Sequence, residues 1–162
     1  MVAWATDRRE RDQAVEIDIL VKAPAPDVNI ETLRQALERA LRAAGEVDVE
    51  LAVSLVGDRT IRRLSRQFLD RDSVTDVLSF PQRDRDDPRS RHLGDVVISM
   101  DTARRQAALL RHSVDGEVRH LAEHGLLHLF GYEHDTAGYV EWNDAAVRFG
   151  LLHHVFDAET IQ

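Results

Sequence analysis

Three histidines in the C-terminal half of the chain are spaced so that they could hold one metal ion. His124 and His128 are four residues apart, and His134 follows six residues later. In a helix, residues four apart lie on one face with Cβ atoms about 5–6 Å from each other, so both rings can converge on one ion. Gly131 can adopt the positive φ that ends a helix, which lets the chain turn back and bring His134 to the same point. The spacing therefore predicts a three-histidine metal site.

The metzincin metalloproteases have the same ligand spacing, with one difference. Their general base is a glutamate directly after the first histidine, whereas this chain has Gly125 there. The sequence thus keeps the ligands of such a peptidase without its base. His120 lies one helical turn before His124 and is an alternative third ligand, but the glycine turn favours His134.

Composition narrows the class of protein. The chain has 162 residues, of which 43% are hydrophobic and 31% are charged, as expected for one domain with a core. No apolar run approaches the ~20 residues of a membrane span, and the first fourteen residues do not resemble a signal peptide, so we expect a cytoplasmic protein with no membrane partner. Without cysteine, only His, Asp and Glu remain as metal ligands. The net charge of −8 disfavours a large nucleic-acid surface but leaves room for a local basic patch.

Hydrophobic periodicity predicts the elements that must position the histidines. Alternation of apolar and polar residues indicates strands, and an apolar residue every three or four positions indicates helices. Strands are expected at residues 15–22, 47–56, 75–80 and 93–99. Helices are expected at residues 30–44, 58–68 and 101–112, from 113 or 115 through the metal motif, and within 137–152.

The order of these elements favours a single α/β domain. Helical crossovers should make the first strands parallel, and a hairpin should add one antiparallel strand. We therefore predict a mixed four-stranded sheet, mostly parallel and packed by helices, at residues 15–155, after a flexible segment at 1–14. Residues 82–91 carry no large apolar side chain, so we expect a mobile loop that buries nothing.

Three sequence blocks together resemble the YbeY family of bacterial rRNA-maturation endoribonucleases. They are Thr75-Asp-Val-Leu-Ser-Phe-Pro81, Leu93-Gly-Asp-Val-Val-Ile-Ser99 and His124-Gly-Leu-Leu-His-Leu-Phe-Gly-Tyr-Glu-His134. Their order and approximate spacing match the family as well. The resemblance is good over about residues 50–135 and covers 15–49 in outline.

The resemblance implies a single-strand-specific, metal-dependent endoribonuclease. It would act in 16S rRNA 3′-end maturation and ribosome quality control, with rRNA and the small ribosomal subunit as partners, and ribosomal proteins or assembly GTPases as further ones. It also implies one zinc ion per chain, bound by His124, His128 and His134.

One position departs from the family in a way that bears on activity. Where the family has an arginine that is implicated in activity, this chain has Leu69, which cannot clamp a phosphate. Negative charge grows on the non-bridging oxygens during phosphoryl transfer, so a cation is expected near the metal. Arg66 and Arg71 flank Leu69 and are candidate phosphate clamps, although the pattern favours a solvated surface residue at each position. Glu133 replaces the family's aspartate before the third histidine.

Two aspartates could support the metal ligands. Asp76 and Asp95 could each orient a ligand histidine through its second ring nitrogen, or could cap a helix or turn. No residue is identified as the general base.

Two other functional classes fit the residues. One is a metal-bound ribosome assembly factor with weak or no nuclease activity, which Leu69 and the acidic charge favour. The other is a different zinc hydrolase such as a peptidase, which Gly125 disfavours.

Overall fold

Alternating apolar residues in β2 (Val49–Val56) put one side of this strand into the core. Val49, Leu51, Val53 and Leu55 are all buried, and three of the four residues between and after them are half-buried. The structure is a computed structural model that describes residues 14–83, 87 and 90–155. The predicted segment at 1–14 lies outside these residues except for its last member.

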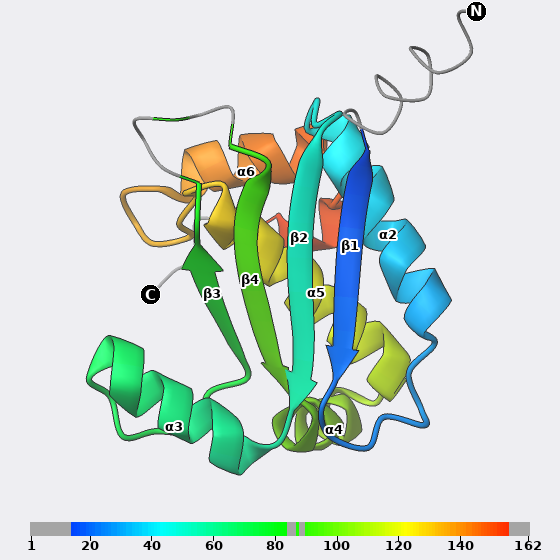
Figure 1. Cartoon of the computed structure of the whole chain (residues 1–162), viewed down its shortest axis with the longest axis vertical. Coiled ribbons are helices and arrows are strands. Elements are labelled where there is room, and N and C mark those ends of the chain that lie inside the picture. Colours follow the sequence, from blue (N-terminus) through cyan, green and yellow to red (C-terminus); the bar gives the residue numbers. More distant parts are fainter. Residues whose placement is uncertain (1–13, 84–86, 88–89, 156–162) are drawn as a thin grey trace, which may run out of the picture.

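The four predicted strands form one sheet in the order β1-β2-β4-β3 (Figure 1). β1 is parallel to β2, β2 is parallel to β4, and β3 is antiparallel to β4. The mixed sheet and its single antiparallel strand are therefore confirmed. The strands other than β2 are β1 (Val15–Val21), β3 (Val77–Pro81) and β4 (His92–Ser99).

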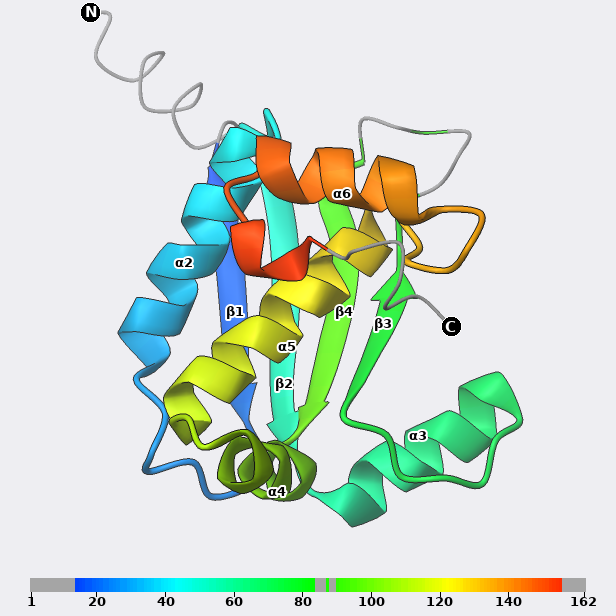
Figure 2. The same cartoon turned by 180° about the vertical axis from the view of Figure 1, so that it is seen from behind.

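Five α-helices and a short 3-10 helix, η1, complete the described part of the chain. One face of the sheet is covered by helices (Figure 2). On this face α5 runs across the strands, and α2 and α6 lie beside α5. The main core lies between this face and those helices. The bounds are α2 Ile30–Ala43, α3 Asp58–Leu69, α4 Met100–Leu110, α5 Val114–Leu129, α6 Tyr139–Arg148 and η1 Leu152–His154.

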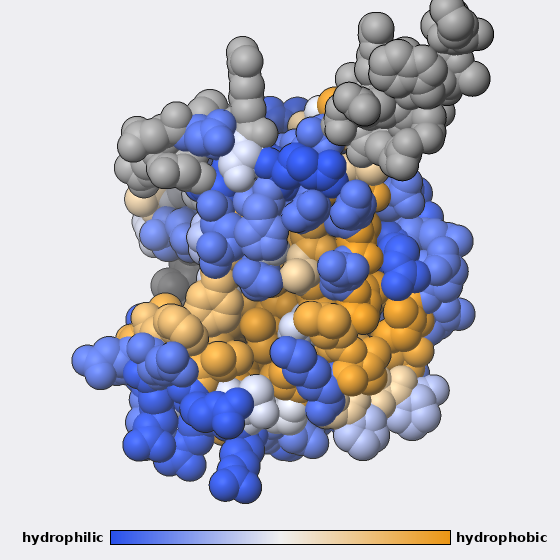
Figure 3. Space-filling view, viewed as in Figure 1, coloured by the Kyte–Doolittle hydropathy of each residue, from blue (hydrophilic) through white to orange (hydrophobic). Residues whose placement is uncertain are grey.

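The other face of the sheet is covered only in part. A second, smaller core forms where α3 packs Ile61 against Val56, Leu78 and Val97. Figure 3 shows apolar side chains gathered across the middle of this face, with polar residues above and below them. No helix among the described residues is long and apolar enough to cross a membrane.

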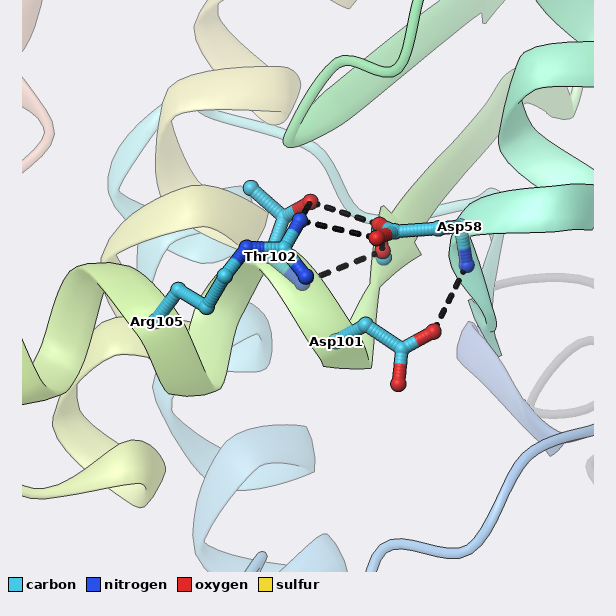
Figure 4. A network of polar contacts seen from close by, with 5 residues as sticks. Asp58, Asp101, Thr102 and Arg105 are labelled. Atoms are coloured by element: carbon cyan, nitrogen blue, oxygen red, sulfur yellow. Dashed lines mark hydrogen bonds and ion pairs between the residues drawn. The ribbon is translucent and has the colours of Figure 1, made fainter.

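A polar network fixes the start of α3 against the start of α4 (Figure 4). Asp58 accepts hydrogen bonds from Ser99 Oγ at 2.6 Å and Thr102 Oγ1 at 2.7 Å. Asp101 in turn accepts one from the Asp58 backbone N–H at 2.8 Å. These bonds satisfy polar groups at two helix N-termini at once, and they set the direction in which α3 leaves the sheet.

The loop at residues 82–91 is anchored at both described ends, so the expectation that it buries nothing is wrong there. Arg83 forms an ion pair with Glu46 at 2.6 Å, and Arg91 forms one with Asp48 at 2.8 Å. Arginine can bury its aliphatic stem while its charged group stays paired, which a count of apolar residues does not detect. Residues 84–86 and 88–89, where mobility was also predicted, lie outside the described residues.

Candidate metal centre

The histidine-bearing helix α5 lies across the sheet because one of its sides is almost continuously apolar. Its N-terminus is capped by Ser113, whose hydroxyl accepts from the Gly116 backbone N–H at 3.0 Å. Val118, Leu121, Leu126 and further residues of the same helix are buried against the main core. His124 and His128 therefore fall at the edge of the buried side of the helix, where each is partly exposed.

The turn that follows α5 depends on Gly131. This residue has a φ of +89°, and its N–H donates to the His128 carbonyl at 2.9 Å. The next N–H, from Tyr132, donates to the Leu127 carbonyl at 3.2 Å. A residue with a Cβ would be strained at this φ, whereas glycine is not. The chain reverses here and returns His134 to the helix end, as the sequence predicted.

His124, His128 and His134 come together in the structure. The Nε2 atoms of His124 and His128 are 3.2 Å apart. One ligand atom from each of the three residues lies within 4.8 Å of the others. Ligands around a tetrahedral zinc ion are about 3.3 Å apart, so small side-chain rotations would close the set on an ion. We call this group the three-histidine centre.

His120 is not part of the three-histidine centre. Its ring centroid is 6.3 Å from that of His124, and it stacks instead on His154 at 4.3 Å. The structure therefore groups the histidines as the glycine turn predicted.

Trp142 of α6 forms a wall of the three-histidine centre, which the sequence did not indicate. Its ring centroid is 4.9 Å from that of His124, 5.0 Å from that of His128 and 4.9 Å from that of His134. The indole is fully buried, and its N–H donates to the His154 carbonyl at 2.7 Å. This rigid apolar wall restricts the three imidazoles to a narrow range of orientations.

Burial keeps two rings of the three-histidine centre, those of His124 and His128, neutral. Burial, together with the neighbouring His128 and His134, lowers the pKa of His124 to about 3. Burial also lowers the pKa of His128, although the carboxylate of Glu133 opposes this shift. Neutral imidazole is the form that binds a metal, so the donor set fits a divalent ion.

Glu133 supports the centre from outside. Its Oε2 lies 3.3 Å from Nδ1 of His128, while Nε2 of that ring faces His124. A carboxylate at Nδ1 favours the tautomer that carries the proton there and leaves Nε2 free for a metal. From the sequence, Glu133 is interpretable only as a substitution for the family's aspartate, and its contact with His128 is not predicted.

The two aspartates proposed as supports have other partners. Asp76 accepts from the Val77 N–H at 2.8 Å and from Gln106 Nε2 at 3.2 Å. The nearest histidine to Asp95 is His92, at 3.8 Å. In the part of the chain that the structure describes, neither carboxylate contacts a ring of the three-histidine centre. Asp76 nevertheless lines the same cavity as His124 and His128.

A cavity of about 480 Å³ opens beside the three-histidine centre. Leu69 lines it from the end of α3, and Arg71 lines it just beyond that end. Arg66 lies elsewhere, on an arginine-rich surface of α3, 3.5 Å from the carboxylate of Asp72. The structure thus separates the two candidate phosphate clamps and places only Arg71 at the cavity.

Gly125 shows why this helix cannot carry a peptidase's base. A Cβ at this position would lie 2.6 Å from Val96 Cγ1 and 3.1 Å from Ser79 Oγ. The hydroxyl of Ser79 donates to the Gly125 carbonyl at 2.8 Å, which draws helix and sheet together. A side chain here would point into the sheet instead of toward the histidines. The site therefore lacks both the base of a metzincin and the space for one.

Fold and site together define an α/β protein with an open three-histidine centre beside a cavity. Residues 18–141 match the model of the family described as "Endoribonuclease YbeY". The chain belongs to the YbeY family, and this membership supports an endoribonuclease role.

Individual relatives agree with this assignment. The chain is 43% identical to an endoribonuclease YbeY of Aquifex aeolicus, over 74% of this chain and 79% of that protein. It is 32% identical to one of a Sulfurihydrogenibium species, over 95% of this chain and 99% of that protein. A solution structure of a Thermotoga maritima protein is similar with a TM-score of 0.59 and 25% identity, covering 86% of this chain and 88% of that one.

Proposed function

We propose that the protein is a single-strand-specific, metal-dependent endoribonuclease that acts on rRNA of the small ribosomal subunit. Its roles would be 16S rRNA 3′-end maturation and ribosome quality control in the cytoplasm, together with ribosomal proteins or assembly GTPases. The observation that carries this proposal is the convergence of three histidines beside a cavity that also contains Arg71. The family of the chain supports the same chemistry.

The three-histidine centre would hold one zinc ion. When bound, zinc would supply Lewis-acid chemistry at a phosphoryl oxygen and would lower the pKa of water. Three neutral ligands cancel none of the ion's charge, so the centre would attract an anionic phosphodiester. Glu133 would hold the His128 ring in its ligating tautomer.

Two residues of the cavity would act on the substrate. The guanidinium of Arg71 makes no ion pair with a described residue and would contact the non-bridging phosphate oxygens as their charge grows. Of the two carboxylates in the cavity, Glu133 is engaged with His128, which leaves Asp76 as the candidate proton acceptor. Gln106 and the Val77 N–H hold Asp76 in place.

The shape of the site supports the proposed selectivity for single strands. His124 and His128 are half-buried at the wall of the cavity. A rigid A-form duplex cannot bring its backbone into such a recess, whereas an unpaired strand can splay its nucleotides to reach it.

The test is single-turnover cleavage of an rRNA fragment that contains the 3′ region of the small-subunit rRNA. Cleavage should stop with a chelator and return with zinc. His128→Ala should lower the rate about thousandfold, because the loss of several kcal/mol of charge stabilisation corresponds to that factor. His92→Ala, which removes a histidine of β4 outside the cavity, is the matched control and should cleave normally.

Leu69 favours one competing function, a metal-bound assembly factor with little nuclease activity. Binding of small subunits by the zinc-loaded protein, with no cleavage of either single-stranded or duplex RNA, would support that function and overturn ours.

A further inference from the structure

A second group of histidines lies where η1 meets α5. His120 stacks on His154 with ring centroids 4.3 Å apart, and His153 lies 5.5 Å from His120. One ligand atom from each of these residues lies within 4.8 Å of the others. The buried carboxylate of Glu123 contacts two of them. We call His120, Glu123, His153 and His154 the second cluster.

The second cluster contains buried polar atoms without hydrogen bonds. The His154 ring is fully buried, and neither of its nitrogens makes a hydrogen bond with a described residue. Oε2 of Glu123, also buried, makes none with good geometry. Buried polar groups in folded proteins almost always have partners, so three such atoms in one place require an explanation.

The spacing of these atoms matches a metal ion's ligands. Oε2 of Glu123 is 2.8 Å from Nε2 of His153 and 3.5 Å from Nε2 of His154. These values bracket the separation of about 3.3 Å between ligands of a tetrahedral zinc ion. The other carboxylate oxygen, Oε1, lies 3.6 Å from Arg119, which would hold the carboxylate in place.

We propose that the second cluster is a four-ligand site for a divalent transition-metal ion such as Zn²⁺. Imidazole nitrogen and carboxylate oxygen suit such an ion, and four protein ligands are typical of a structural site. An ion can reach it from solvent, because Glu123 and His153 line a cavity of about 230 Å³ and His120 lines another of about 410 Å³. The site goes beyond the proposed function, since no step of RNA cleavage uses it.

The bound ion would fasten η1 to α5. Two of its ligands come from η1, and the other two come from α5. The His154 carbonyl accepts from Trp142, and Trp142 packs on all three rings of the three-histidine centre. The second ion would therefore stabilise the wall of the first site without touching its ligands.

Metal stoichiometry of the full-length protein tests this inference. The demetallated protein is titrated with Zn²⁺ in competition with a chromophoric chelator. The wild type should bind two equivalents, and His128→Ala and His153→Ala should each bind one. The double variant should bind none, and His92→Ala should bind two. Truncation of His153 should not disturb folding, because its side chain is 47% exposed.

Two further measurements report on the second site separately from the first: the Zn²⁺ affinity of Glu123→Gln and the effect of Zn²⁺ on the Tm of His128→Ala. Glu123→Gln preserves the shape of a buried side chain and should weaken the second equivalent at least tenfold, while circular dichroism reports on the fold. Excess Zn²⁺ should still raise the Tm of His128→Ala, and this rise should vanish in the double variant. A wild type that binds one equivalent, or a His153→Ala variant that binds two with unchanged affinity, would overturn the second site. Neither result depends on ribonuclease activity.

Discussion

The three-histidine centre and the second cluster share one helix but differ in where their carboxylate lies. In the three-histidine centre, Glu133 contacts the outer nitrogen of a ligand ring and is 64% exposed. In the second cluster, Glu123 is 4% exposed and lies among the ring nitrogens themselves. A carboxylate outside the ligand set leaves the ion its full charge, whereas a carboxylate inside cancels part of it.

The surroundings of the two clusters also differ, because one is open to a cavity and the other is largely buried. The cavity beside the three-histidine centre is lined by Arg71 and Leu69, and it can admit a substrate. The second cluster uses a fully buried ring, His154, and has four candidate ligands. An open set with three ligands suits chemistry, and a closed set with four suits structure. One helix face thus supports two kinds of site, because the residues that pack on it differ.

The largest expected effect tests whether the open site acts on phosphate. Arg71→Ala should lower single-turnover cleavage of rRNA about 100–1,000-fold, because one charged donor to the transition state is lost. Arg71 is exposed, so the Tm should not change. Arg66→Ala should lower the rate less than about tenfold, since Arg66 faces Asp72 and not the cavity. Equal losses of rate in both variants would mean that the substrate's phosphate also contacts the arginine-rich surface of α3.

A smaller effect is expected from restoring the family's arginine. In the Arg71→Ala background, Leu69→Arg should recover up to about hundredfold in rate, because the new guanidinium enters the same cavity. Leu69 is 46% exposed, so the fold should tolerate the change, and a melting curve checks this. In the wild type the gain should be smaller, because Arg71 already supplies a cation.

The matched control for this rescue is Val74→Arg. It adds the same charge at an exposed apolar residue that does not line the cavity. Rescue by both variants would mean that net charge, and not a contact in the cavity, governs the rate.

Sequence alone was sufficient where the determining contacts are local. His124 and His128 are one helical turn apart, and the turn at Gly131 depends on the φ of a single residue. The strand directions could also be predicted, because alternation and crossover rules act on neighbouring elements. The contact between Glu133 and His128 is also local, but spacing does not reveal which way a side chain turns.

Sequence was insufficient where segments distant in the chain meet. The second cluster joins His120 to residues more than thirty positions later, and nothing in the spacing shows that η1 folds back onto α5. Trp142 could be assigned to a helix but not to the wall of a metal centre. The different positions of Arg66 and Arg71 depend on where α3 ends, at Asp70 in the left-handed conformation. Each of these contacts is decided by tertiary packing.

The smallest expected effect, on stability against pH, compares the two clusters without metal. Burial lowers the pKa of His124 to about 3 and that of His120 to about 4, the latter assisted by His154 and His153. Burial also lowers the pKa of His128 and of His154, against the carboxylates of Glu133 and Glu123. These four rings are therefore neutral in the folded protein at pH 7, whereas an unfolded histidine takes up a proton near pH 6.5.

The sign of the pH effect follows from this difference. Above pH 6.5 neither state is protonated, and this stability is fully present. As the pH falls below 6.5, the unfolded chain binds protons that the folded chain does not, so stability is lost progressively toward pH 4 for His120 and pH 3 for His124. The slope is at most about 1.4 kcal/mol per pH unit for each histidine, and less for the half-exposed His120 because solvent screens its charge.

Urea unfolding at pH 7, 6 and 5 in the presence of a chelator measures this slope. His124→Gln and His120→Gln should each flatten it by a similar amount, because the folded pKa of each ring lies below this pH range. The carboxylate of Glu123 raises the folded pKa of His154, and that of Glu133 raises the folded pKa of His128. Glu123→Gln should therefore steepen the slope. Glu133→Gln should steepen it less, because Glu133 is exposed. A slope that is flat between pH 7 and 5 in the wild type would mean that the rings exchange protons as freely as in the unfolded chain. Burial would then not keep these rings in the neutral form that binds a metal.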